Sequence, residues 1–225
     1  GIEAASLARL GFTASHDAFA GPQSFLNAHH AAHDGGKQIS GWSFDNFLFS
    51  SVSHKLHACC HGTHAMIEAL LLLLANSTDL ADDFEKIEVE VAPRWQNVCD
   101  IKTPSTGLEI KFSYVFLAAM VLHHIDSAAY QSYDDSICGD AGLIATASKI
   151  TVIGDEAISD GAVNVSADTQ TGVRHTTDFD LMDPIDLSVL GPRLVAKASV
   201  LIGRARAEKI WESMDNLDSM PAAQM

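Results

Sequence analysis

The pattern of apolar and polar positions predicts helices at both ends of the chain and a mixed middle. Small and apolar residues recur at helical spacing from Ile2 to Leu10, and Gly11 is a typical stop signal. An unbroken apolar run over Ala65–Ala75 predicts a buried helix. A second apolar helix is predicted over Phe112–Leu122, with Ser113 near its start.

Strands are indicated where charged and apolar residues alternate, as over Lys86–Ala92. A strand at Asp45–Val52 is expected to lead into the segment around Lys55, and Tyr130–Gly142 has an irregular polar pattern. Further short strands are predicted at Lys149–Ile153, Ala162–Ala167 and Val173–Thr177, with a hairpin turn at Thr169–Gly172.

Helical signals return at the end of the chain. Asp186-Leu187-Ser188 is typical of a helix start, and an amphipathic pattern continues to about Leu217 with a break near Gly203. Pro221–Met225 is expected to be frayed. Near the other end, a helix is predicted from Gly21-Pro22 to about His30. Together these elements predict an α+β fold: a small mixed α/β domain flanked by helices of one all-α body.

Composition narrows the class of function. The chain has 225 residues, 47% of them hydrophobic, which suits one large domain or two small ones with a real core. Its formal charge of −15 argues against nucleic acid as a partner, because phosphate binding needs clustered Lys and Arg. The longest apolar run is about half of what a bilayer span requires. Four cysteines in a chain of this length form no disulfide framework, so we expect a cytoplasmic protein.

Candidate chemistry is concentrated in one stretch, Lys55–His64, which reads Lys-Leu-His-Ala-Cys-Cys-His-Gly-Thr-His and follows His54. It immediately precedes the apolar helix, so it should occupy the loop and first turn at that helix's N-terminus. Backbone N–H groups are unpaired there and the helix dipole favours negative charge. A lysine, several imidazoles and a helix N-terminus together predict a binding site for a carboxylate.

Two other interpretations of this stretch remain open. His54, His57, His61 and His64 could bind a metal with Cys59 or Cys60, but the spacing matches neither a paired Cys-x-x-Cys frame nor the His-Glu-x-x-His pattern of zinc hydrolases. No acidic residue lies within the stretch to serve as a base at such a metal site. Cys60 could also be a nucleophile activated by the helix N-terminus, the lysine and a histidine, although no Asn or Asp partner can be identified from the sequence. A separate group, His29, His30 and His33, is interpreted as a solvated helix end.

Four stretches in order along the chain resemble the MmgE/PrpD family, which includes 2-methylcitrate dehydratases, cis-aconitate decarboxylases and iminodisuccinate epimerases. The family motifs are Leu-Ala-x-x-Gly-Phe-Thr, Phe-Glu-Gly-x-x-Gly-Phe, Lys-x-Tyr-Pro-Cys-Cys-x-x-Thr-His and Glu-Ala-Lys-Phe-Ser. The similar stretches here are Gly1–Thr13, Phe19–Phe25, Lys55–His64 and Glu109–Ser113.

The resemblance implies an all-helical domain built from residues 1–48 and about 188–225, with an α+β domain over residues 49–187 between them. It covers the later half of a usual family member, so an upstream helical half is expected, and family sites lie in the cleft between the two domains. The apolar faces of the 2–10 and 192–217 helices would then be uncovered, which predicts a homodimer or a complex with a partner chain.

The function implied is a lyase or isomerase that abstracts a proton next to a carboxylate of a small di- or tricarboxylate, without a cofactor or metal. A 2-methylcitrate dehydratase-like reaction is expected, with decarboxylase- or epimerase-like activity, or an inactive fragment that only dimerises, as alternatives. By position, the catalytic residues would be Lys55, Cys60, His61 and His64, and the substrate-binding residues Lys55, His57, Lys111 and Ser113. The chain departs from the family at His57-Ala58, where the family has Tyr-Pro, and at Phe116, where it has an active-site Tyr.

Overall fold

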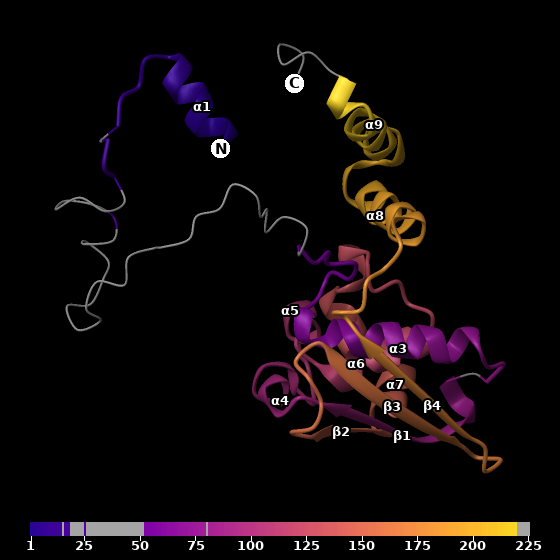
Figure 1. Cartoon of the computed structure of the whole chain (residues 1–225). Helices are drawn as coiled ribbons and strands as arrows, with labels where there is room; N and C mark the ends of the chain where they lie inside the picture. Colours follow the sequence, from indigo (N-terminus) through magenta and orange to yellow (C-terminus); the bar gives the residue numbers. More distant parts are fainter. Residues whose placement is uncertain (15, 19–24, 26–51, 80, 220–225) are drawn as a thin grey trace, which may run out of the picture. The chain divides into compact units, whose positions relative to one another are not determined.

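The computed structural model describes residues 1–14, 16–18, 25, 52–79 and 81–219, and the chain divides into two units, 1–52 and 53–225. In the first unit, α1 (Ile2–Arg9) forms over the predicted helix (Figure 1). The helix expected after Gly21-Pro22, the His29–His33 group and almost all of the strand expected at 45–52 lie outside the described residues, as does the end after residue 219. The domain boundaries predicted at residues 48 and 187 stay predictions.

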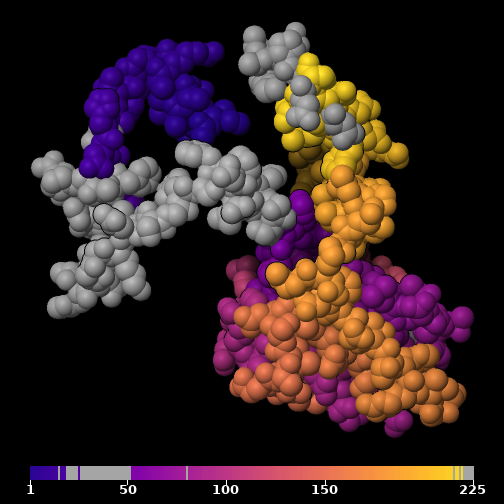
Figure 2. Space-filling model, viewed as in Figure 1, coloured from indigo at the N-terminus to yellow at the C-terminus, as the bar shows by residue number. Residues whose placement is uncertain are grey.

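The second unit contains the α+β fold that the sequence predicted, built on a sheet with the strand order β2-β1-β3-β4. β1 pairs in parallel with β2 and antiparallel with β3, so that Val89 lies between Val152 and Val165. β3 and β4 form an antiparallel hairpin, which lies on the surface of this unit in the space-filling view (Figure 2). The strands are β1 (Phe84–Val91), β2 (Ile150–Gly154), β3 (Ala162–Thr169) and β4 (Arg174–Asp180).

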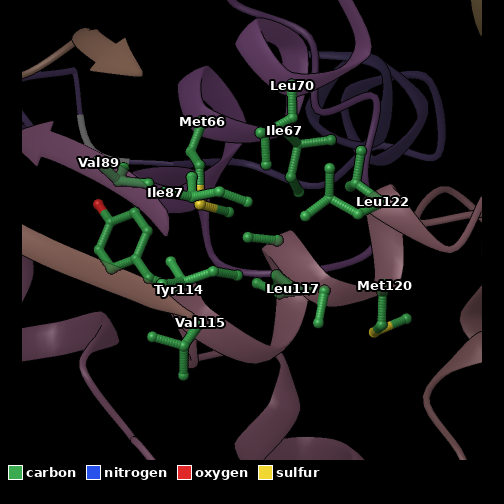
Figure 3. Close-up of a cluster of buried hydrophobic side chains, with 14 of the residues drawn as sticks. Met66, Ile67, Leu70, Ile87, Val89, Tyr114, Val115, Leu117, Met120 and Leu122 are labelled. Atoms are coloured by element: carbon green, nitrogen blue, oxygen red, sulfur yellow. The ribbon is translucent and has the colours of Figure 1, made fainter. Parts of the chain in front are cut away.

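The core lies where the two apolar helices meet one face of the sheet (Figure 1). These helices are α3 (His64–Ala75) and α6 (Tyr114–Leu122), and all nine residues of α6 are buried. On β1 the apolar residues point into this core and the glutamates between them point away, as period-two alternation requires. The packed side chains come from all three elements (Figure 3): Met66, Ile67, Leu70, Ile87, Val89, Tyr114, Val115, Leu117, Met120 and Leu122.

Several short helices were not predicted. α4 (Pro93–Cys99) begins directly after β1, with proline at its first position, where the missing N–H costs no hydrogen bond. α7 (Ala141–Ala147) begins inside the segment predicted to be irregular, because the Asp140 side chain accepts a hydrogen bond from Leu143 N at 2.9 Å and caps it. α5 (Gly107–Ile110) forms in the same way after Thr106. Single-turn 3₁₀ segments occur at Ala81–Asp83, Tyr130–Ser132, Asp135–Gly139 and Leu217–Ser219.

The predicted C-terminal helices are present. α8 (Leu187–Ile202) is capped by the Asp186 side chain, and α9 (Arg204–Asp215) follows the predicted break at Gly203. Gly203 has φ +86°, a conformation that side chains disfavour. Neither α8 nor any other helix in the described residues is long and apolar enough to cross a membrane.

Truncation of the core should cost far more than truncation at the surface. Leu70 is fully buried on α3, whereas Leu108 on α5 is 68% exposed. We expect Leu70→Ala to lower the free energy of unfolding by about 2–5 kcal/mol through lost contacts and a residual cavity. The matched variant Leu108→Ala should change it by less than about 0.5 kcal/mol. Urea unfolding followed by circular dichroism measures both; equal losses would contradict the core described above.

Candidate functional site

The cluster predicted from the sequence lies at the N-terminal end of α3. Two backbone hydrogen bonds hold the preceding segment in place: Ala58 N donates to Ser127 O at 2.8 Å, and Cys60 N donates to Lys111 O at 3.0 Å. The chain then makes a 3₁₀ turn over His61–Thr63 and enters the helix. The cluster is therefore fixed against two loops that are distant in sequence.

Gly62 is required in this turn because the backbone approaches a tryptophan closely. A Cβ on Gly62 would lie 2.4 Å from the ring of Trp95 on α4. The Tyr114 hydroxyl donates to the Gly62 carbonyl at 2.7 Å and anchors the same turn to α6. Both contacts set the position of the histidines on either side of Gly62.

His64, the first residue of α3, is only 1% exposed, and its Nε2 has no hydrogen-bond partner among the described residues. Its ring centroid is 5.0 Å from that of His57 and 5.4 Å from that of His61. Burial lowers the pKa of His64 to about 3, and positive charge on His57, His61 and Lys55 acts in the same direction. At neutral pH the ring is therefore uncharged.

The hydrogen-bonding pattern indicates which nitrogen of His64 carries the proton. The backbone carbonyl of Cys59 hydrogen-bonds to the ring and can only accept. We assign the proton to Nδ1 on this basis, which leaves a lone pair on Nε2, the nitrogen without a partner among the described residues. A buried lone pair of this kind can accept a proton or a hydrogen bond from a ligand.

His57 is held between a carboxylate and a hydroxyl. Its Nε2 lies 2.8 Å from Glu68 Oε1 and its Nδ1 lies 2.8 Å from Ser127 Oγ. Glu68 also accepts two hydrogen bonds from Arg193 of α8, at 3.0 and 2.5 Å. Burial alone would raise the pKa of Glu68, but the bonds from His57 and Arg193 outweigh it and lower this pKa to about 2. Glu68 is thus an ionised, buried carboxylate.

Lys55 lies on the exposed rim of the cluster, and its backbone carbonyl accepts a hydrogen bond from the Lys197 ammonium of α8. Burial lowers the pKa of Lys197, and the charge of Lys55 lowers it further. Neither ammonium group forms an ion pair with any residue in the described part of the chain. Two like charges therefore lie near one another, with no ion pair to an acid in the part of the chain that the structure describes.

The thiols next to the histidines differ in exposure. Cys59 is buried, with its sulfur 3.2 Å from Thr63 Oγ1, and burial raises the pKa of its thiol. Cys60 is half-buried and precedes the 3₁₀ turn. Burial also raises the pKa of Cys99, which hydrogen-bonds to Cys60. Of these thiols, Cys60 is the one with a partly accessible sulfur beside the histidines.

The other predicted substrate-binding residues lie next to this cluster in different roles. Ser113 is fully buried, and its hydroxyl accepts the Phe116 N–H at 3.2 Å, which caps α6. The Lys111 ammonium lies 5.0 Å from the centroid of the Tyr133 ring. Phe116, where the family motif has Tyr, is buried in α6 and lines a separate cavity of about 500 Å³ together with residues of β2.

The sequence did not indicate Glu68, Ser127, Arg193 or Lys197. No acidic residue lies within Lys55–His64 in the sequence, but the folded cluster does contain one. Glu68 lies one helical turn after His64 and bonds to His57. One signal was available: Glu68 is the single charged residue in the apolar run Ala65–Ala75, and a carboxylate there needs partners.

The metal alternative gains no support from the geometry. In residues 52–79 and 81–219, as in the described parts of the first unit, no three His, Cys, Asp or Glu side chains are arranged to hold a metal ion. Of the histidine series, His57 has both ring nitrogens in hydrogen bonds to protein groups.

Comparison with known proteins identifies a family for this chain. The family model described as the MmgE/PrpD C-terminal domain matches residues 57–182, more than half of the chain. No curated protein matches the chain.

The low pKa of His64 should be measurable as a pH-dependent stability. Between 6.5, the ordinary value, and about 3, the unfolded chain binds a proton that folded His64 excludes, so the free energy of unfolding falls as pH falls. The slope for this group is at most about 1.4 kcal/mol per pH unit. Glu68 adds to the loss only below 4.5, its ordinary pKa.

We therefore expect His64→Gln to flatten the dependence of unfolding free energy on pH between 6.5 and 5, measured by urea unfolding at several pH values. His54→Gln, a change at an exposed histidine nearby, is the matched control and should leave the slope as it is. An unchanged slope in His64→Gln would show that the buried ring does not titrate as described.

Proposed function

Because the chain belongs to the MmgE/PrpD family, we propose that it forms part of a lyase or isomerase acting on a small di- or tricarboxylate. The family's members are generally lyases, many of them dehydratases. The reaction proposed is proton abstraction from a carbon next to a carboxylate, followed by loss of water as in 2-methylcitrate dehydratase. Reprotonation, as in the epimerases, shares the same first step. Loss of CO₂, as in the decarboxylases, leaves the electron pair on carbon directly, and a proton is then added there.

The observation that carries this proposal is the uncharged, buried His64 with a lone pair on Nε2 at the start of α3. A proton abstraction needs a base within reach and positive charge for the developing enediolate. Nε2 of His64 is the candidate base. Lys55 and the N-terminal end of the α3 dipole supply the positive potential.

A histidine with a pKa of about 3 is a weak base, but the same electrostatics describe how a substrate would activate it. The positive charges of His57, His61 and Lys55 hold the pKa of His64 down. A bound carboxylate adds negative charge at this point and favours the protonated ring. Substrate binding therefore raises the basicity of His64 when a proton has to be taken.

The remaining predicted residues have subsidiary roles in this proposal. His61 and Cys60 are the candidates for returning a proton to the departing or rearranged group, since both lie beside His64 and are partly exposed. His57, held by Glu68 and Ser127, keeps the ring of His64 in place through their edge-on contact. Lys111 supports the site because its backbone carbonyl accepts the Cys60 N–H. Ser113 supports it by capping the start of α6.

The competing function is a non-catalytic chain that only assembles with another copy. Phe116, at the position of the family's active-site tyrosine, favours this second reading because it has no acidic hydroxyl to offer. Activity of the full-length protein towards 2-methylcitrate, citrate and cis-aconitate separates the two. If His64→Gln has no effect on a measured turnover, His64 is not the base.

Carboxylate binding should depend on Lys55. We expect Lys55→Ala to weaken citrate binding by about tenfold or more, in the range for a hydrogen bond to a charged group, as measured by isothermal titration calorimetry on the full-length protein. Lys209→Ala removes an exposed lysine of α9 and should alter affinity by less than about twofold. Unchanged citrate affinity in a folded Lys55→Ala protein would exclude Lys55 from the site.

We also propose that the protein self-associates. On α1 the exposed apolar side chains include Ile2 at 90% and Leu10 at 80%, and on α8 Leu187 is 67% exposed. Apolar surface of this kind is typical of interaction sites. Sedimentation velocity at micromolar concentration should give about twice the protomer mass; a single monomeric species would contradict the dimer.

A further inference from the structure

A cavity of about 380 Å³ lies between α8 and the loops that hold His57 and Ser127. This is within the size range of small-molecule sites. Its lining includes the apolar residues Leu56, Val121, Ile125 and Val200 and the polar residues His57, Ser127, Arg193 and Lys197. The cavity thus combines apolar surface with a few polar groups, the usual composition of a ligand site.

The charges around this cavity are unequal. Arg193 is already neutralised by its two hydrogen bonds to Glu68. Asp126 also lines the cavity, and its hydrogen bond from the uncharged Ala128 N–H at 2.8 Å does not neutralise a carboxylate. Among the described residues no ion pair joins Lys197 to Asp126 or to any other acid, and Lys55 adds a second positive charge close to Lys197.

The lysine pair Lys55 and Lys197 has no ion-pair partner among the described residues, although the chain has 29 acidic and 14 basic residues. Exposed basic side chains elsewhere in the described part of the chain are of both kinds: Lys86 and Arg174 are paired with acids, whereas Arg206 and Lys209 are not. What sets Lys197 apart is its position, partly buried at a cavity and bonded to the Lys55 carbonyl. Holding Lys197 partly buried beside Lys55 costs desolvation and repulsion, and a bound anion would remove both costs.

We propose that Lys197 of α8, together with Lys55, forms a subsite for a carboxylate group, so that a ligand with several carboxylates occupies the cavity with one of them on the lysine pair. The remaining part of the ligand lies beside His57 and Ser127, which line the same cavity. This inference rests on the proposed function in one respect, the polycarboxylate nature of the ligand. It goes further by placing a specificity-determining residue on α8, outside the sequence cluster.

Lys197 also donates to the Lys55 carbonyl, so a purely structural role has to be separated from ligand recognition. The number of carboxylates on the ligand makes this separation. If Lys197 binds one carboxylate of several, its loss should weaken the binding of tricarballylate, which has three carboxylates. It should weaken the binding of propionate much less, because the single carboxylate of propionate can bind elsewhere in the site. A structural role would affect both ligands equally.

The experiment is isothermal titration calorimetry of tricarballylate and propionate into the full-length protein and its Lys197→Met, Lys197→Arg, Lys55→Met and Lys209→Met variants. We expect Lys197→Met to weaken tricarballylate binding by about tenfold, the effect of losing one charged hydrogen bond, and to change propionate binding by less than about twofold. Lys197→Arg should restore most of the tricarballylate affinity because it restores the charge. Lys209→Met should match the unaltered protein.

The outcomes distinguish this inference from the proposed function. If Lys55→Met weakens tricarballylate binding and Lys197→Met does not, the subsite on α8 is wrong and the proposed function stands. Equal weakening of both ligands by Lys197→Met, or no recovery in Lys197→Arg, assigns Lys197 a structural role and overturns the subsite. If the unaltered protein binds neither ligand, both proposals fail.

Discussion

The buried carboxylate of Glu68 is the group on which the arrangement of the candidate site depends. It lies in a helix that is otherwise almost entirely apolar, and an ionised group in such a position is tolerated only with full hydrogen bonding. His57 and Arg193 provide that bonding from two other segments of the chain. Removing either partner would leave a buried charge, which typically costs about 3–5 kcal/mol. Glu68 thereby fixes the orientation of His57 and the position of α8 with one set of contacts.

The side chains around this carboxylate are mostly positively charged, whereas the net charge of the whole protein is negative. The chain carries −15 overall, yet Lys55, Lys197 and Arg193 come together around one end of α3 with Glu68 as the acid bound among them. A local region of positive potential in an acidic protein raises the local concentration of small anions. The same positive charges act together with burial to keep His64 uncharged, so in the proposed function anion binding and the protonation of the histidine are coupled.

Local patterns were sufficient to predict much of the fold. The apolar runs at Ala65–Ala75 and Phe112–Leu122 and the alternation at Lys86–Ala92 are signals within single elements, and each corresponds to a helix or strand. α4 and α7 were missed because their helical signals are a proline and a capping aspartate in short polar stretches, which loops also use. A periodic pattern of apolar residues arises where one face of a helix is buried, and α4 and α7 are only partly buried.

For the site, the sequence could indicate only groups that are neighbours along the chain. The cluster at the start of α3 was predicted because Lys55, His57, His61 and His64 lie within ten residues. Arg193 bonds to Glu68 across 125 positions, and Ser127 to His57 across 70, so neither contact has a local signature. The role of Ser113 also depends on tertiary context, since a serine before an apolar helix is both a common cap and a candidate ligand-binding residue.

The strand order has a consequence for how this unit assembles. β3 and β4 are joined by a short turn and can pair within microseconds of contact, since only a small loop has to close. β1 cannot complete its parallel ladder with β2 until the whole stretch through α4, α5, α6 and α7 has been ordered between them. Long-range parallel pairing of this kind slows folding, because the entropy of closing the large loop is lost before the contacts form. We expect the β1–β2 ladder to form late. Because β3 and β4 follow β2 in the chain, the core helices have a complete sheet to pack against only after synthesis has passed Asp180, the end of β4.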